Sequence, residues 1–363
     1  YNMPWHLYDP KGLAMALGAS YDAMQEALKL AANATPIEQA MINALKSRYP
    51  KREPIEDLLP WNKDYTNTMR KLLDAHPSDL EVRSVFVEAI MNETPWRMWD
   101  LPTGKPFKHA HTEEAMAVMD HAFETMPAAW EHPGLLHLYV HLMEMSPFPQ
   151  KALRAGDKLR EIMPDSGHLV HMPTHIDVLC GHYRDVLTYN NKASGPDRRF
   201  LAYSDDPGIY LMYIIHNFHF AIYGATFLGQ YTPAIEAAEE LIATVPEAAL
   251  RIESPPMADF LEAYLTMKQH VLVRFGKWQE IIDQDLPDDQ ELYCSNVAMI
   301  HYAKAVANSA LGNVAAAEME KTNFLAAKDR VPDTRRVHNN TVIDLLAVAE
   351  EMLEGELEYR KGN

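Results

Sequence analysis

Apolar residues recur every three to four positions along most of this chain, the spacing that places them on one face of an α-helix. Segments with the alternating pattern of a strand are almost absent. We therefore predict an all-α protein. The helical period is clear over Leu13–Ala32, Pro36–Arg48, Tyr65–Ala75, Asp79–Met91, Thr112–Met126, Pro133–Met145, Gln150–Met163, Leu169–Cys180, Gly208–Leu228, Pro233–Val245, Met257–Phe275, Gln290–Leu311, Val314–Lys328 and Asn340–Leu353.

The segment between residues 181 and 207 is the longest stretch without a predicted helix. The basic pair Arg198-Arg199 follows directly after Pro196-Asp197. We interpret this pair as part of a solvated turn.

Turn signals recur between the predicted helices. Glycines that open a turn stand at Gly181, Gly229, Gly276 and Gly312, at separations of 48, 47 and 36 residues. Tetratricopeptide repeats have a period of about 34 residues and consist of helical hairpins that must stack to bury a core. The spacing predicts degenerate, tetratricopeptide-like hairpins stacked into a right-handed superhelix, an α-solenoid, over residues 1–363. Within it we expect N-terminal repeats in 1–126, histidine-rich repeats in 127–230 and C-terminal repeats in 231–363.

Composition excludes several classes of partner. The chain has 363 residues, 47% of them hydrophobic, and a formal net charge of −18 at pH 7. Nucleic acids and anionic membrane surfaces are bound by basic faces, which this charge disfavours. No segment of membrane-spanning length lacks charges, so we expect no membrane insertion. The chain opens at Tyr1–Trp5 without an initiator methionine. This opening suggests a processed or trimmed N-terminus and leaves the compartment open.

Histidines gather in three short segments. The segments are His137-x3-His141-x2-Glu144, His168-x2-His171-x3-His175-x-Asp177 and His216-Asn217-x-His219. Residues three, four and seven apart share a helix face, and facing helices with such residues are how helical proteins build metal sites. The candidate metal ligands are His137, His141, Glu144, His171, His175, His216 and His219.

We expect His137, His141, His171 and His175 to converge on one centre, with His216 and His219 contributing next. His168 follows a glycine, so we interpret it as a cap of the helix that begins there. The cysteines Cys180 and Cys294 lie far apart in the sequence and form no zinc-binding pattern. Nitrogen and oxygen atoms would therefore hold the metal.

The polar residues beside these histidines allow several roles. Glu144 could bind the metal, orient an imidazole, or act as a general base, which makes it the candidate catalytic residue. Asp177 lies two residues after His175, on a different helix face, and is interpreted as structural. Asn217 could form a hydrogen bond within the site or take part in helix packing.

Three long motifs resemble those of a known family. They are His132-Pro-Gly-Leu-Leu-His137-Leu-Tyr-Val-His141-Leu-Met-Glu144-Met-Ser146, then Gly167-His-Leu-Val-His171-Met-Pro-Thr-His175-Ile, and His216-Asn217-Phe-His219-Phe220. They are similar to the motifs HPGxxHxxxHxxExS, GHLVHMP[ST]HI and HNxHF of an atypical tetratricopeptide-repeat family. The opening Tyr1-Asn2-x-Pro4-Trp5 and the segment from Ala89 to Trp96 also resemble it. The resemblance implies a helical-repeat fold and that a further hairpin precedes Tyr1, but no settled activity.

The donor set favours a transition metal. Six imidazoles with one or two carboxylates contain more nitrogen than a magnesium, calcium or carboxylate-bridged di-iron site. Imidazole suits copper, iron and zinc, which we rank in that order. The sequence predicts an oxidoreductase that uses O2 on a small molecule at a copper centre, mononuclear or dinuclear, or at a non-haem iron. A zinc-dependent hydrolase is the alternative within the enzyme class.

A non-catalytic function is the second alternative. Helical-repeat arrays bind proteins or peptides on their concave face, and a histidine cluster could then be a structural metal site. The fold alone does not separate the two classes. The pair His109-Ala-His111 lies in a polar loop, and we interpret it as surface.

Overall fold

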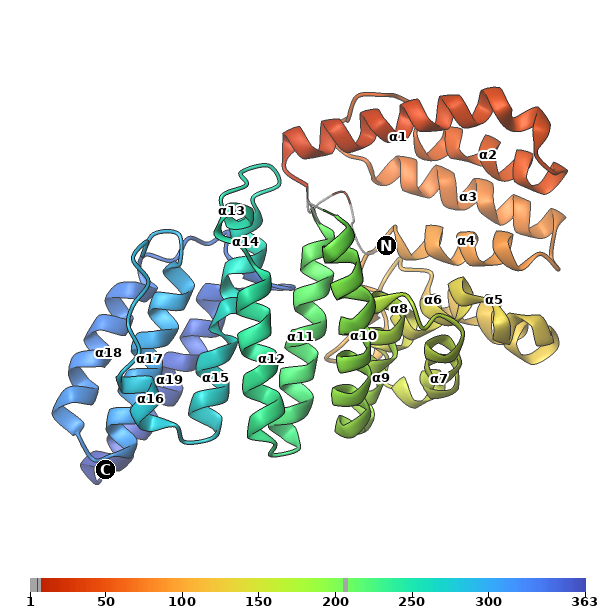
Figure 1. Cartoon of the computed structure of the whole chain (residues 1–363). Helices are drawn as coiled ribbons and strands as arrows, with labels where there is room; N and C mark the ends of the chain where they lie inside the picture. Colours follow the sequence, from red (N-terminus) through yellow and green to blue (C-terminus); the bar gives the residue numbers. More distant parts are fainter. Residues whose placement is uncertain (1–4, 6–7, 205–207) are drawn as a thin grey trace. The chain divides into compact units, whose positions relative to one another are not determined.

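The computed structural model describes residue 5, residues 8–204 and residues 208–363 (Figure 1). Tyr1–Pro4, which begin the Tyr-Asn motif, lie outside the described residues. Helices dominate the described part of the chain, whose strands form two short antiparallel hairpins. The all-α prediction is confirmed. None of these helices has both the length and the apolar composition needed to cross a membrane.

The chain divides into two compact units, residues 1–182 and residues 183–363. Each unit is described by itself. The finer subdivision at residues 126 and 230 stays a prediction.

The first unit consists of sequential helices and one hairpin. Its elements are α1 (Pro10–Leu30), η2 (Ala31–Asn33), α2 (Pro36–Arg48), α3 (Leu59–Ala75), α4 (Leu80–Met91), β1 (Trp99–Asp100), β2 (Lys105–Pro106), α5 (Thr112–Thr125), η3 (Pro127–Glu131), α6 (Pro133–Met143), η4 (Pro149–Ala152), α7 (Leu153–Ile162), α8 (Gly167–His171) and α9 (Pro173–Cys180). Helices α1 to α4 pack in sequence order, each against the next (Figure 1).

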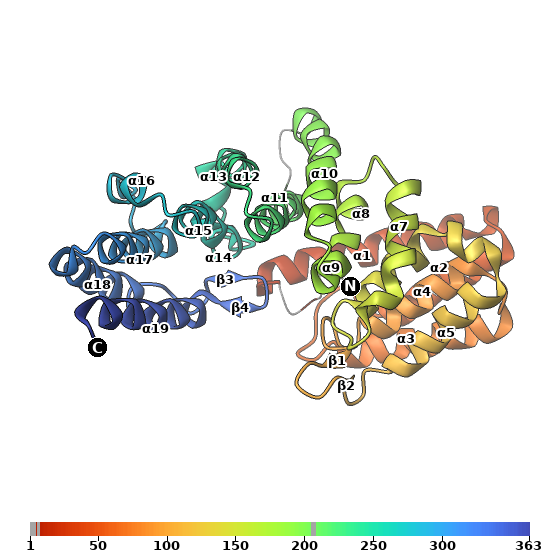
Figure 2. The same ribbon diagram turned by 90° about the horizontal axis from the view of Figure 1, so that it is seen from below.

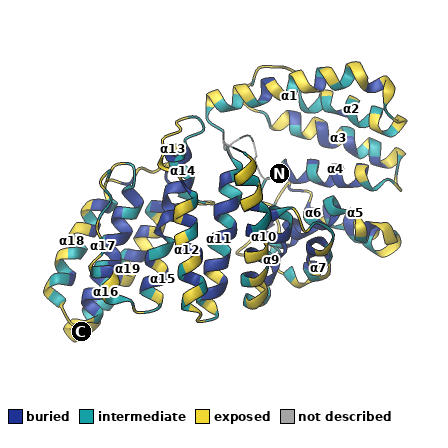
Figure 3. Ribbon diagram, viewed as in Figure 1, coloured by how far each residue is buried: buried dark blue, intermediate teal, exposed yellow. Residues whose placement is uncertain are grey.

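Local sequence signals define where these helices begin. The side chain of Asp9 accepts hydrogen bonds from the backbone N–H groups of Lys11 and Gly12 at the start of α1. At α2, Thr35 and Glu38 form a reciprocal capping box, which satisfies backbone donors that have no partner within the helix. The core of the unit runs from α2 to α9 and includes Met69, Phe86 and Leu136. Figure 3 shows α4, most of whose residues are buried, mainly in dark blue.

The second unit consists of helices from 4 to 21 residues long and one hairpin. Its elements are α10 (Tyr183–Tyr203), α11 (Tyr210–Phe227), α12 (Tyr231–Thr244), α13 (Glu247–Leu250), α14 (Met257–Leu261), η5 (Glu262–Thr266), α15 (Met267–Arg274), α16 (Trp278–Ile282), α17 (Cys294–Ala310), α18 (Val314–Lys328), β3 (Arg336–Val337), β4 (Asn340–Thr341) and α19 (Val342–Lys361). Figure 2 shows the β3–β4 hairpin beside α19, which it contacts.

The turn glycines of the sequence pattern adopt the expected conformation. All four glycines have φ between 64° and 81°, in the left-handed region that glycine adopts more readily than other residues at helix ends. They are Gly181, Gly229, Gly276 and Gly312. Each follows a helix, at the end of α9, α11, α15 and α17. The pattern thus located these four helix ends correctly.

The turn predicted around Arg198-Arg199 is wrong, because α10 runs through both residues and contains Pro196 in its interior. Proline removes one backbone donor and usually breaks a helix. Here tertiary contacts hold the helix. Arg198 forms two hydrogen bonds with Glu240 of α12, at 2.6 and 2.7 Å. Asp197 is buried and accepts hydrogen bonds from the side chains of Asn217 and Tyr210. These partners lie more than ten residues away, beyond the reach of local sequence signals.

Candidate metal centre

Helix α6 presents the first histidine pair. His132 is its N-cap, and the ring Nδ1 accepts a hydrogen bond from the backbone N–H of Leu135 at 3.2 Å. Pro133 follows at the first helical position, where its missing N–H has no cost. One turn separates His137 from His141, so both rings project from the same face, with centroids 4.6 Å apart. Glu144 is the C-cap residue.

Helices α8 and α9 supply the other histidines of the cluster. His168 and His171 lie on α8, and His175 lies on α9. Helices α7 and α9 pack closely at Gly156. A Cβ atom added there would stand only 2.9 Å from Cβ of Pro173, closer than real Cβ atoms approach one another. The absence of a side chain at Gly156 therefore permits the approach that places α9.

Three of these histidines form one group. His137, His141 and His168 can each offer one ring nitrogen such that the three atoms lie within 4.8 Å of one another. The Nε2 atoms of His137 and His168 are 3.1 Å apart. Two nitrogen ligands at about 2.0–2.1 Å from one ion stand about 2.9–3.4 Å apart for bond angles between octahedral and tetrahedral. The observed separation matches that spacing, and the group could hold a metal ion.

His171 and His175 form a neighbouring pair. Their Nε2 atoms are 3.0 Å apart, again the spacing of two ligands of one ion. His171 is fully buried, and 17% of the His175 side chain is exposed. The ring centroids of His168 and His171 are 6.4 Å apart, so the pair lies next to the three-histidine group.

Glu144 joins the group to the pair. One carboxylate oxygen is 2.8 Å from Nδ1 of His141, and the other is 2.8 Å from Nδ1 of His175. Both carboxylate oxygens are therefore engaged by imidazole nitrogens from different helices. Only 11% of the Glu144 side chain is exposed. It is therefore not a solvated residue at a helix end.

The protonation states suit metal binding. Burial lowers the pKa of His137 well below its ordinary value, and the neighbouring His141 adds to this effect. Burial also lowers the pKa of His168, with a further contribution from His137. Burial alone would raise the pKa of the Glu144 carboxyl, but the imidazoles of His175 and His141 outweigh it and hold the pKa well below its usual range. Neutral rings at His137 and His168 and an ionised carboxylate at Glu144 are forms suited to metal binding.

The arrangement differs from the prediction in two respects. His137, His141, His171 and His175 do come together, but as two groups linked by Glu144 and not around one centre. His168 is not the cap, because Ser166 is the N-cap residue of α8 and His168 belongs to the three-histidine group. The spacing His168-x2-His171, which places both rings near one face of a helix, was the available signal for its role.

His216 and His219 lie on α11 in the second unit. The ring of His216 is 4.8 Å from that of His338, between centroids, and the ring of His219 is 5.4 Å from that of Tyr264. Their role as metal ligands stays a prediction. Asn217 donates to Asp197 of α10 at 2.7 Å and so takes part in helix packing.

Two further expectations from the sequence agree with the structure. Asp177 is structural: it forms a buried ion pair with Arg160 of α7, with a distance of 3.0 Å between Oδ2 and Nη2. His109 and His111 are exposed, and both have positive φ.

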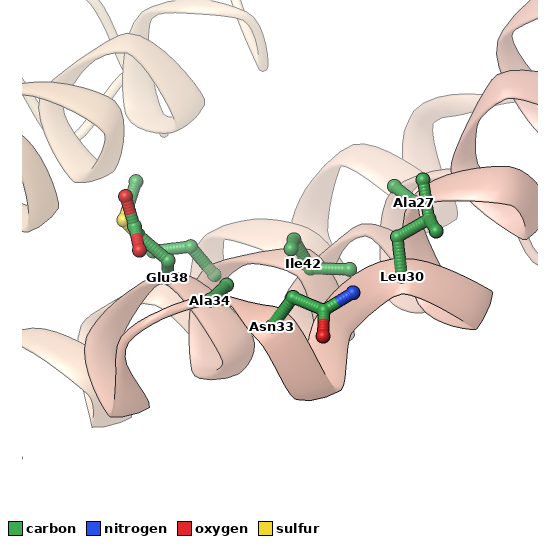
Figure 4. Close-up of a pocket in the computed structure, with 7 residues that line it drawn as sticks. Ala27, Leu30, Asn33, Ala34, Glu38 and Ile42 are labelled. Carbon is green, nitrogen blue, oxygen red and sulfur yellow. The ribbon is translucent and has the colours of Figure 1, made fainter.

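A pocket elsewhere in the first unit lacks comparable chemistry. It has a volume of about 590 Å³ and lies along α1, η2 and α2 (Figure 4). Its lining is mostly apolar and includes Leu30, Met41 and Ile42. The ionisable residue in this lining, Glu38, already accepts hydrogen bonds from Thr35 in the capping box of α2. The histidine cluster is therefore the better candidate for a functional site.

No protein-family model matches the chain, and no curated protein matches it. The site is therefore interpreted from its own geometry.

Proposed function

We propose that this protein is a metal-dependent oxidoreductase that uses O2 to oxidise a small molecule. The three-histidine group of His137, His141 and His168 supports the proposal most strongly, because it offers imidazole ligands only, with His171, His175 and Glu144 beside it. Imidazole-rich sets suit copper first, then non-haem iron. O2 would accept the electrons that the substrate loses at the metal. The scaffold would be a tetratricopeptide-like superhelix of the atypical family that the motifs resemble.

Zinc-dependent hydrolysis is the second candidate. Three histidines with an open fourth position also form the zinc site of hydrolytic enzymes. His137, His168 and His175 are each partly exposed to solvent, as access of a small substrate to the metal would require. A structural metal site in a protein-binding array would instead be closed to solvent. That exposure favours an enzyme over a scaffold.

Metal analysis of the purified protein tests the proposal. We expect copper or iron in the wild-type chain by plasma mass spectrometry, and its loss in a His137→Ala/His141→Ala variant. O2 consumption with a panel of phenols, amines and alcohols should then depend on the bound metal. Zinc as the stable metal, with no O2 consumption, would favour the hydrolase. A chain that binds no metal after reconstitution with copper, iron and zinc would contradict both the oxidoreductase proposal and the hydrolase alternative.

The control for this experiment is an exposed histidine pair outside the cluster, which tests for adventitious binding at surface histidines. A His109→Ala/His111→Ala variant removes two imidazoles from an exposed loop. We expect this variant to retain the wild-type metal content. Equal loss in both variants would indicate non-specific binding to surface histidines.

A further inference from the structure

The bridging position of Glu144 has a consequence for the number of metal ions. A carboxylate is an acceptor only, so a nitrogen at 2.8 Å from each oxygen must be a donor. The hydrogen bonds therefore require protonated Nδ1 atoms on both His141 and His175. In the neutral ring the lone pair then lies on Nε2. Through these hydrogen bonds, Glu144 leaves Nε2 of His141 and Nε2 of His175 able to bind a metal ion, one in each of the two histidine groups.

We propose that Glu144 is a positioning residue that holds His141 and His175 in the Nε2-ligating tautomer and thereby supports two separate metal positions. This inference rests on the proposed function. The first position comprises His137, His141 and His168, and the second comprises His171 and His175. Glu144 then binds neither ion directly and takes no proton from substrate.

The Nε2 separations support two positions. In the group, His137 and His168 face each other through Nε2 at 3.1 Å, and in the pair His171 and His175 do so at 3.0 Å. Without an ion, each contact places a single proton between two nitrogens. An ion would take the place of that proton in each contact. Both contacts have the spacing of two ligands of one ion, so each group offers a place for its own ion.

Replacement of Glu144 by glutamine gives an asymmetric test. A glutamine amide has one acceptor oxygen and one donor nitrogen, so it can accept from only one Nδ1–H group. The other histidine must accept from the amide NH2 through Nδ1 and carry its proton on Nε2, where it can no longer bind a metal. Loss of such an outer hydrogen bond typically weakens metal binding about 10–100-fold.

The experiment measures metal equivalents in the wild-type chain and in Glu144→Gln, with free Cu(II) held about tenfold above the wild-type dissociation constant. Both wild-type positions are then nearly filled, and a position weakened about 10–100-fold is at most about half filled. We expect two equivalents in the wild type and one in the variant. Glu161→Gln replaces an exposed carboxylate on α7 and should retain two. Two equivalents in a folded Glu144→Gln protein would overturn the inference. Loss of both would also overturn it and would identify Glu144 as a direct ligand.

A second measurement does not depend on metal binding by any of the proteins. Long-range ¹⁵N–¹H spectra of metal-free wild-type protein, labelled in histidine, report which ring nitrogen carries the proton. His141→Gln and His175→Gln assign the two signals. We expect the proton on Nδ1 in both rings, and a proton on Nε2 alone in either ring would overturn the inference. A wild-type chain that binds no metal would contradict the proposed function, and these spectra would still decide the role of Glu144.

Discussion

Gly156 and Gly355 are both helical glycines, but they differ in whether the structure has space for a Cβ atom. Both lie inside helices, α7 and α19, where glycine destabilises the helix relative to alanine by about 0.5–1 kcal/mol. At Gly156 a Cβ would stand 2.9 Å from Cβ of Pro173, and that ring atom is fixed to the backbone. At Gly355 a Cβ would meet no atom within 4 Å. Close packing at Gly156 thus overrides helix propensity.

Alanine substitutions at the two glycines should therefore have opposite effects. We expect Gly156→Ala to lower the free energy of unfolding by about 1–3 kcal/mol through overpacking. Gly355→Ala should raise it by up to about 1 kcal/mol. Urea unfolding followed by circular dichroism measures both. If Gly156→Ala is as stable as the wild type, the contact between α7 and α9 is looser than described.

Helix α6 depends on an unusual cap. Serine, threonine, aspartate and asparagine are the usual N-cap residues, but here the imidazole Nδ1 of His132 accepts the N–H of Leu135. The following Pro133 begins the helix, and Gly134 lies so close to Ser84 of α4 that a Cβ would stand 2.5 Å from its Oγ. The segment His132-Pro133-Gly134 is thus explained by helix initiation and packing.

Removal of this cap should destabilise the helix that carries His137 and His141. We expect His132→Ala to lower the free energy of unfolding by about 1 kcal/mol, because one backbone N–H loses its acceptor. His132→Asn provides a side-chain oxygen and should recover most of that loss. Thermal unfolding of the two variants and the wild type gives the comparison. Equal stability of the alanine and asparagine variants would show that the cap contributes nothing.

Helix α17 is capped from a distance by a buried acid. Glu262 of η5 is fully buried, and its carboxylate accepts the backbone N–H groups of Ser295 and Asn296 at the start of α17. Burial raises the pKa of Glu262 above its ordinary value of 4.5, although these hydrogen bonds and Arg335 oppose the shift. The folded chain therefore binds this proton more tightly than the unfolded chain.

The pH dependence of stability follows from that shift. The stabilising contribution of the protonated acid is fully present below the unfolded pKa and is lost as pH rises from about 4.5 through the higher folded pKa. Glu262→Gln cannot titrate. We therefore expect the unfolding free energy of the wild type, minus that of Glu262→Gln, to decrease between pH 4 and pH 8. An increase over this range, measured by urea unfolding at several pH values, would contradict the raised pKa.

The two units have separate cores. Met69 is fully buried in the core of the first unit, and Leu353 is fully buried in a core of the second. Five of the six tryptophans lie before residue 183, and Trp278 lies after it. Tryptophan fluorescence thus reports mainly on the first unit, whereas far-ultraviolet circular dichroism reports on both.

Core substitutions should therefore separate two unfolding transitions. Met69→Ala and Leu353→Ala each create a cavity and should cost about 2–5 kcal/mol in their own unit. We expect Met69→Ala to shift the fluorescence transition to lower urea concentration. Leu353→Ala should shift the dichroism transition and leave the fluorescence midpoint almost unchanged. Equal shifts in both signals for both variants would indicate one cooperative unit.

Local signals in the sequence determined the helices, their turn glycines and the residue types that could bind a metal. The helical period and glycine placement depend on neighbours within a few residues, so they are readable from the chain itself. The spacing of His137 and His141, and of His171 and His175, likewise predicted which rings share a helix face. The missed helix α10 marks the limit, because contacts with Glu240 and Asn217 stabilise it against Pro196.

Tertiary structure alone decided how the histidines are grouped. His168 joins His137 and His141 because α8 packs against α7 and α9, which both pack against α6, and no spacing within one helix encodes that approach. Glu144 engages His141 on its own helix and His175 on another, so its bridging position is a property of two packed helices. A sequence pattern specifies directions around one helix axis, whereas a metal centre requires distances between axes, which packing sets.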